Sequence, residues 1–207
     1  MIAYDKYKPS NIDWIGDIPE HWHIKRIKNI CSFIYGDSLA EEDRVEGNIL
    51  VFGSNGATGF HNQANTLSPC IIIGRKGSFG KINFSYEPIF SIDTTYFIDS
   101  KCTNQNLRWL YYCLDSLSLD KFSKDTGVPG LNREDTYREK LSLPLKPEQI
   151  SIANYLDEQT QKIDSLISNK KSQIEKLKEL RKIKIYEAVS GKIRIPLTEK
   201  VGEYAET

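Results

Sequence analysis

The longest regular pattern of polar and apolar residues lies toward the C-terminus and predicts one long helix. No glycine or proline occurs from Glu148 to Ser190, a run of about 43 residues. A helix of that length spans about 65 Å at ~1.5 Å per residue. Pro147 suits the first turn of a helix, and Glu148 places a negative charge near the positive end of the helix dipole. Gly191 is a typical C-terminal stop.

Apolar side chains recur along this helix at intervals of three, four and seven residues, as they do along the seam between paired helices. The seam consists of Leu156, Ile163, Leu166, Ile167, Ile174, Leu177, Leu180 and Ile183. Polar residues interrupt it, and such interruptions reduce stability but can set the register or the choice of partner: Thr160, Lys170, Arg181 and Lys184. A helix this long needs a partner helix. The alternative is an antiparallel hairpin within one chain, but the sequence contains no second helix of comparable length.

The remainder of the chain predicts a mixed α/β domain, so the expected fold class is α+β with one long C-terminal coiled-coil helix. Strands are expected at 48–52, 70–74, 81–85, 95–98 and 140–144, a helix at 106–117, and a loop at 123–138. The expected parts are an N-terminal arm (1–30) that packs on the domain, the domain itself (31–146), the long helix (147–192) and a tail (193–207).

Composition restricts the partners and the compartment. Lys and Arg total 28 and Asp and Glu total 28, which excludes a uniformly basic nucleic-acid coat but not a local basic surface. The four cysteines lack CxxC spacing and are expected to be buried free thiols. No apolar stretch approaches ~20 residues and no signal peptide is visible, so we expect a soluble, cytoplasmic protein with no membrane contact.

Three loops carry polar side chains that could bind a ligand. In the turn 53–56, Ser54 and Asn55 would lie at an exposed tip, where an Asn can read an adenine edge or simply tolerate a left-handed turn. The glycine-rich loop 74–81 could approach phosphate or a guanine edge, although a plain basic hairpin fits equally well. The side chains singled out in the second and third loops are Arg75, Lys76, Ser78, Lys81, Lys124, Thr126, Asn132 and Arg133.

Signals for catalysis are weak. His21 and His23 flank Trp22 without a cysteine or acid at metal-ligand spacing, so a zinc site is not expected. The sequence contains no Walker loop, dinucleotide fingerprint or nucleophile elbow. A long helix beside a domain with basic, glycine-shaped loops is more typical of a recognition module than of an enzyme.

Several short motifs, in this order and spacing, make the chain resemble a half-length specificity subunit of a type I restriction-modification system. They are Tyr7-Lys8-Pro9-Ser10, Trp14-Ile15-Gly16, Ile18-Pro19-Glu20-His21-Trp22, Gly53-Ser54-Asn55-Gly56, Ile73-Gly74-Arg75-Lys76-Gly77, Val128-Pro129-Gly130-Leu131-Asn132, Glu148-Gln149, Ile152-Ala153, Leu156-Asp157, Thr160, Ile163-Asp164 and Ala188-Val189-Ser190-Gly191-Lys192-Ile193. Each motif alone is weak, and the combination spans nearly the whole chain.

The resemblance implies a target recognition domain over 31–146 that reads half of a bipartite site in double-stranded DNA. It also implies that the long helix sets the half-site spacing and docks methyltransferase (M) subunits, and through them restriction (R) subunits. The subunit itself would hold no cofactor, because S-adenosylmethionine, ATP and Mg²⁺ act in those partners. Members usually carry two recognition domains and two helices. Three origins remain open for this chain: a natural half-length subunit, a truncation product or an excised fragment. A natural half-length subunit would form a homodimer and recognise an inverted repeat.

Other classes remain open at this stage. A stand-alone DNA-binding regulator would share the DNA-reading loops but lack a methyltransferase partner. An exchange cassette would pair its helix with another specificity half. A cryptic nuclease or methyltransferase is disfavoured by the lack of a cofactor or metal motif.

Overall fold

The computed structural model describes residues 3–122 and 130–196, and the chain divides between Tyr155 and Leu156 into two units. The first unit contains every strand of the described residues, two α-helices and the start of a third. The second contains the remainder of that third helix. This combination confirms the predicted α+β class with a long C-terminal helix.

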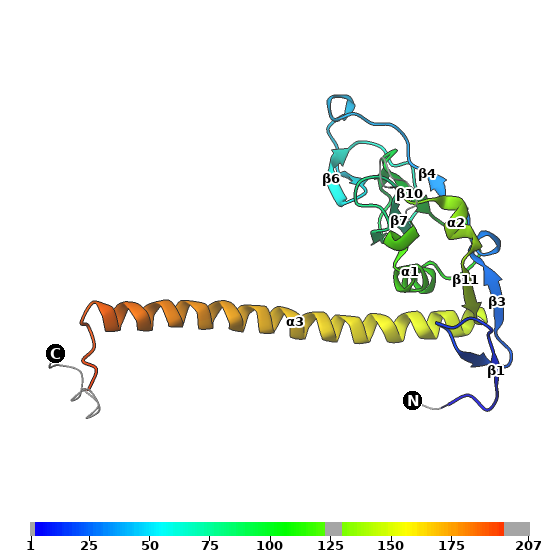
Figure 1. The fold of residues 1–207 in the computed structure, drawn as a ribbon. Helices are drawn as coiled ribbons and strands as arrows, with labels where there is room; N and C mark the ends of the chain where they lie inside the picture. The colour runs from blue at the N-terminus through cyan, green and yellow to red at the C-terminus, as the bar shows by residue number, and fades with distance from the viewer. Residues whose placement is uncertain (1–2, 123–129, 197–207) are drawn as a thin grey trace, which may run out of the picture. The chain divides into compact units, whose positions relative to one another are not determined.

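The first unit is built around a four-stranded antiparallel sheet (Figure 1). Its strand order is β4 (Ile34–Tyr35), β10 (Thr95–Ile98), β7 (Cys70–Gly74) and β8 (Ile82–Ser85). All five residues of β7 are buried, as its unbroken apolar run predicts for a strand covered on both faces. The predicted strands at 70–74 and 95–98 are confirmed without change of bounds.

A second sheet of three strands packs beside the first. It has the order β6 (Gly56–His61), β5 (Ile49–Gly53) and β9 (Phe90–Ser91), with β9 parallel to β5. The two residues Ser54 and Asn55 connect β5 to β6, so the predicted turn is confirmed. In Figure 1 the four-stranded sheet lies between this smaller sheet and α1 (Leu107–Ser116).

Helix α1 covers the core because its apolar residues return at helical spacing. Leu107, Leu110 and Leu114 are buried in the same cluster as Ile71, Ile73 and Tyr96 of the sheet. The Asn106 side chain accepts a hydrogen bond from the Trp109 backbone N–H at 2.8 Å and caps the helix, which satisfies one of its unpaired first-turn donors. The predicted helix at 106–117 is therefore confirmed.

Residues 3–30 contain regular structure and contribute to the core. Strands β1 (Tyr7–Pro9) and β2 (Asp17–Pro19) form a small antiparallel pair, and β3 (His23–Arg26) leads into the short 3-10 helix η1 (Ile27–Asn29). Strand β3 pairs with β11 (Lys140–Leu143), more than a hundred residues later. Two further 3-10 helices are η2 (Glu41–Asp43) and η3 (Leu119–Phe122).

The prediction of a loop over residues 123–138 is wrong for residues 133–138. Residues Arg133–Arg138 form the short helix α2, and the preceding Asn132 caps it by accepting from the backbone N–H groups of Glu134 at 3.0 Å and Asp135 at 3.2 Å. A helix of six residues is too short to show an apolar period, so only the capping residue and the acidic first turn could have indicated it.

The long helix α3 runs from Lys146 to Val189, which agrees with the predicted run from Glu148 to Ser190 to within two residues at each end. Gly191 adopts a positive φ of 70°, and its N–H donates to the Ala188 carbonyl, as expected for a glycine stop. The start of α3 is anchored in the first unit by Gln149, whose side chain is completely buried and fully hydrogen-bonded.

Candidate functional site

The β5–β6 turn and the loop between β7 and β8 lie against each other. A Cβ added to Gly74 would come within 2.3 Å of the Ser78 carbonyl oxygen and 3.0 Å of the Ser54 carbonyl oxygen, so only glycine permits this approach. The Lys81 ammonium donates to the Asn55 backbone oxygen at 2.7 Å and to its Oδ1 at 3.1 Å. Two of the three predicted loops therefore form one surface.

The third loop joins that surface through the backbone. Lys76 forms an antiparallel bridge with Gly130, and the Leu131 N–H donates to the Arg75 carbonyl at 2.9 Å. Between these segments lies an open cleft of about 380 Å³. Its polar and aromatic lining comes from Tyr35, Arg75, Lys76, Tyr96, Asn132, Arg133 and Glu134. We name it the arginine–tyrosine cleft.

Two arginines lie over one tyrosine ring in this cleft. The Tyr35 ring centroid is 5.2 Å from the Arg75 Cζ and 5.1 Å from the Arg133 Cζ, within the range of cation–π attraction. Tyr35 also contacts Tyr96, with ring centroids 4.9 Å apart. Burial, aided by its contact with Tyr35, raises the pKa of Tyr96, so this phenol stays neutral at physiological pH. The arrangement holds two positive charges close together at the mouth of the cleft.

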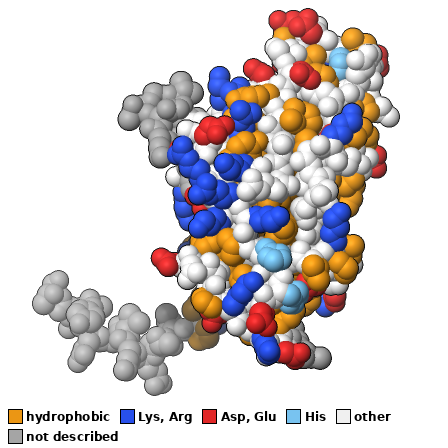
Figure 2. Space-filling view, turned by 90° about the vertical axis from the view of Figure 1, so that its right-hand side faces the viewer, with side chains coloured by type: hydrophobic (Ala, Val, Ile, Leu, Met, Phe, Trp, Pro, Cys, Tyr) orange, Lys and Arg blue, Asp and Glu red, His pale blue; other side chains and the backbone are white. Residues whose placement is uncertain are grey.

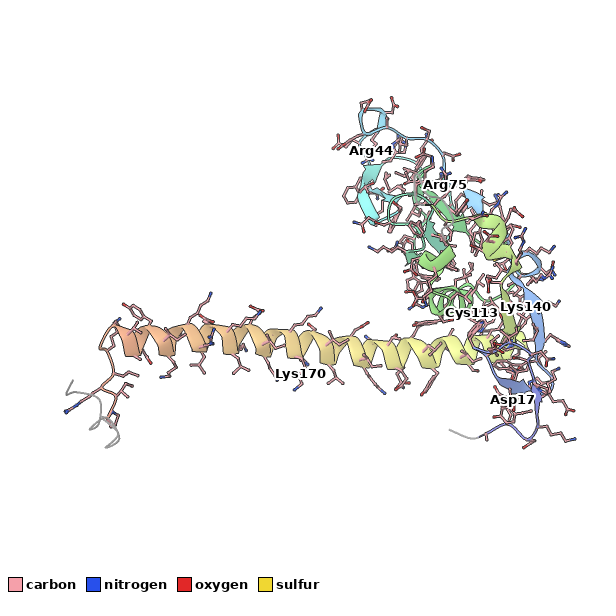
Figure 3. All side chains as sticks on the ribbon, in the orientation of Figure 1. Asp17, Arg44, Arg75, Cys113, Lys140 and Lys170 are labelled. Atoms are coloured by element: carbon pink, nitrogen blue, oxygen red, sulfur yellow. The ribbon has the colours of Figure 1, made fainter. Side chains whose placement is uncertain are left out.

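The two arginines differ in how much of each is free for a ligand. Arg75 donates from Nε at 3.0 Å and from a terminal nitrogen at 2.5 Å to the Asp93 carbonyl, which fixes its direction. Figure 3 labels Arg75 in this part of the unit. Arg133 has a buried Nε with no hydrogen-bond partner among the described residues, and this nitrogen makes only a long ion pair with Glu134 at 3.7 Å. Arg133 is therefore the more available guanidinium.

The structure sorts the predicted residues by place. Arg75, Lys76, Asn132 and Arg133 meet in the cleft, while Ser54 and Asn55 form the adjoining turn. Lys81, at the end of the glycine loop, is hydrogen-bonded to that turn, and Ser78 is exposed on the same loop. The Asn132 Oδ1 is committed to capping α2, and the Asn55 Oδ1 is held by Lys81. Lys124 and Thr126 lie outside the described residues. Roles in DNA contact remain predictions for all of them.

Sequence reasoning missed Tyr35 and Tyr96. Tyr35 belongs to a strand of only two residues, and its neighbour Tyr96 is brought beside it by the β4–β10 pairing. No local signal marks either residue. An aromatic ring beside loops rich in arginine would have been the clue, but only strand pairing shows that they are neighbours.

Basic side chains gather on one side of the first unit. Figure 2 shows the face of the molecule that lies on the right-hand side of Figure 1, where β3, α2 and β11 are found. Lys and Arg side chains gather along one border of this face. Within residues 3–122 and 130–196 no group of three His, Cys, Asp or Glu side chains could hold a metal ion. Over the same ranges, no helix is long and apolar enough to cross a membrane.

A family profile described as "type I restriction modification DNA specificity domain" matches residues 19–176, which is more than half of the chain. The chain belongs to this family. The matched range includes the cleft, the four-stranded and three-stranded sheets and the first two thirds of α3, so it contains all the residues of the cleft. No curated protein matches the chain.

Solved structures of type I specificity subunits share the fold. The S subunit from M. genitalium has 22% identity over 72% of this chain and 41% of its own, with a TM-score of 0.58. The HsdS subunit from Thermoanaerobacter tengcongensis has 21% identity over 77% of this chain and 41% of its own, with a TM-score of 0.58.

A chain from a study of complex assembly and conformational transition of the type I R-M system has 22% identity and a TM-score of 0.64. That match covers 86% of this chain and 46% of the other. This chain thus spans less than half the length of these structural relatives.

Proposed function

We propose that this specificity domain reads one half of a bipartite DNA site for a type I restriction-modification system. The observation that carries the proposal is the arginine–tyrosine cleft, where two distant segments of the chain present Arg75, Lys76 and Arg133 together. Arginine forks match both the phosphate group and the O6/N7 edge of guanine, and a cleft of this kind suits the edge of a duplex groove.

The residues of the cleft divide by how firmly they are held. Arg75 is fixed to the Asp93 carbonyl and gives a directed positive charge for a backbone phosphate. Arg133, stacked on Tyr35 and without a hydrogen bond at its buried Nε, is the candidate for a base edge. Lys76 and Ser78 are exposed beside them and suit phosphate contacts.

The long helix is proposed to pair with an equivalent helix of a second copy and to dock methyltransferase subunits. Its seam is exposed: Ile163, Leu166 and Leu177 retain 54%, 61% and 63% of their accessible surface. An exposed apolar stripe of this length is unfavourable in water and is typical of an unfilled helix interface. Thr160, which interrupts the seam, already donates its hydroxyl to the Leu156 carbonyl at 2.7 Å, so it can enter an interface without an unpaired hydroxyl donor.

Chemistry in the assembled system is proposed to belong to the partners. Methyltransferase subunits would use S-adenosylmethionine to modify adenine, and restriction subunits would use ATP and Mg²⁺ for translocation and cleavage. The role of this chain would be non-catalytic: to choose the DNA sequence and to position those subunits on it.

Two measurements test this function. Light scattering after size exclusion should give a dimer that takes up a methyltransferase subunit, and selection from a random duplex library should enrich a motif with inverted-repeat symmetry. The seam variant Leu166→Asp/Ile174→Asp should be monomeric. Its matched control, Ser168→Asp/Ser172→Asp, adds the same charge on the opposite helix face and should stay dimeric. A monomer that binds DNA but ignores the methyltransferase would instead be a stand-alone regulator or an exchange cassette.

A further inference from the structure

A second basic surface lies outside the cleft, on the strand pair formed by β3 and β11. Its members are Arg26, Lys28 and Lys140, which we call the basic ribbon. All three side chains are exposed, and none makes an ion pair or side-chain hydrogen bond with another described residue. Figure 3 labels Lys140 on this strand pair.

The ribbon is unfavourable in the isolated chain. In the antiparallel register Lys140 stands directly opposite Arg26, so two like charges project from the same face of the pair. Opposed like charges destabilise a strand pair, whereas an acid at either position would stabilise it. Glu139 adjoins Lys140 in sequence but makes no ion pair within the described residues, and Asp135 is engaged with Arg138 at 2.9 Å. The positive charge is therefore uncompensated.

The ribbon continues the cleft. Helix α2 begins at Arg133, which lines the cleft, and ends at Arg138, two residues before Lys140. Six residues of helix advance about 9 Å. One strand of a DNA duplex presents a phosphate about every 3.4 Å along its axis, so a span of this length corresponds to about two to three phosphates. Helix α2 also contacts η1, which carries Lys28, so the two surfaces share one rigid support.

We propose that the basic ribbon binds backbone phosphates of the DNA duplex that flanks the half-site read by the cleft. This inference rests on the proposed function of the cleft. Two of the three side chains are lysines, which act as point charges on phosphate rather than as forks for base edges. The ribbon therefore adds affinity that does not depend on sequence and depends strongly on salt.

The test uses the full chain and the double variant Arg26→Gln/Lys140→Gln. The control Lys6→Gln/Lys101→Gln removes the same charge from two exposed lysines outside the ribbon. Binding of a long random-sequence duplex is measured by fluorescence anisotropy over a salt series. Each phosphate contact contributes about 0.9 to the slope of log affinity against log salt, so the ribbon variant should lose about 1.8 per bound chain. The control slope should stay at the wild-type value.

Two further readouts separate this role from a structural one. Thermal unfolding of the ribbon variant should occur at the wild-type temperature or above, because the substitution removes a repulsive pair. The motif enriched from a random duplex library should be the same for wild type and variant. On the selected motif, extending the duplex beyond the motif should raise the affinity of wild type and control but not of the ribbon variant.

Each failure has a different meaning. If the ribbon variant keeps the wild-type slope while Arg75→Gln reduces it, the ribbon inference is overturned and the function of the cleft stands. If the ribbon variant binds DNA normally but no longer takes up a methyltransferase subunit, the ribbon is a protein-docking surface and the inference is again overturned. If the wild-type chain binds no duplex at all, the proposed function falls together with it.

Discussion

Replacing Gln149 should test what anchors the start of the long helix α3 in the first unit. Gln149 is completely buried, and its Oε1 accepts from the Asn106 N–H at 2.9 Å. Its Nε2 donates to the Gln105 Oε1 at 2.8 Å and to the Pro144 carbonyl at 3.0 Å. One side chain thus joins the first turn of α3 to the N-terminus of α1 and to the end of β11.

The cost of Gln149→Ala follows from the groups left behind. The Asn106 N–H and the Pro144 carbonyl lose a partner in a buried place, and each such group costs about 1–3 kcal/mol. The Gln105 amide is only half-buried and can turn to water. The two groups together would cost about 2–6 kcal/mol. Because a water molecule can enter the space that the side chain leaves, we expect the free energy of unfolding to fall by the lower part of this range, about 2–4 kcal/mol.

Urea unfolding followed by tryptophan fluorescence measures this loss, since Trp109 is buried at the start of α1 beside the affected N–H. The control is Gln161→Ala, an exposed glutamine on the same helix, which should change stability by less than about 0.5 kcal/mol. Gln149→Glu adds a test by pH. Burial should raise the pKa of the new carboxyl. The stability that Gln149→Glu loses relative to wild type should therefore be smallest below the usual Glu pKa and grow as pH rises toward neutrality. Equal stability of Gln149→Ala and Gln161→Ala would refute the anchoring argument.

Three further predictions concern the cleft, the helix start and the thiols. Arg75→Ala should lower DNA affinity, and Arg133→Lys should keep the salt slope yet relax sequence choice at one position, read by library selection; an unchanged motif would remove Arg133 from base contact. Burial disfavours ionised Glu148, but hydrogen bonds from Trp22, His21 and the Leu145 N–H outweigh it and lower its pKa. Wild type should thus exceed Glu148→Gln in stability at pH 7 and lose that advantage as pH falls below about 4.5; a constant difference in urea midpoints from pH 7 to pH 3 would contradict it. Burial raises the pKa of Cys70 to about 11 and of Cys113 to about 12, so a thiol reagent at pH 8 should label the native chain far more slowly than the guanidinium-unfolded chain; immediate labelling of every thiol would show that the core is open.

Elements specified by local pattern could be predicted from the sequence. The apolar run of β7, the two-residue turn after β5, the period of α1 and the uninterrupted course of α3 each depend on residues within one segment, and each was confirmed. Helix α2 was missed because six residues cannot show a period and its cap, Asn132, had been read as a ligand contact. Cys31 and Cys70 are buried free thiols as predicted, whereas Cys102 and Cys113 are only half-buried.

The candidate site was predictable only in part. The sequence identified Arg75, Lys76 and Arg133 as candidate contacts because their residue types and glycine-shaped loops suit phosphate and base edges. It did not show that they share a cleft with Tyr35 and Tyr96, nor that Lys140 stands opposite Arg26 on a second basic surface.

The chain by itself therefore determined the long helix with its apolar seam, the buried central strand and the basic loops, because spacing, glycine placement and residue type act over a few neighbouring residues. The tertiary structure decided which of those groups meet. Pairing of β4 with β10, β3 with β11 and Lys76 with Gly130 joins segments tens to more than a hundred residues apart, and only packing around the shared core selects those partners.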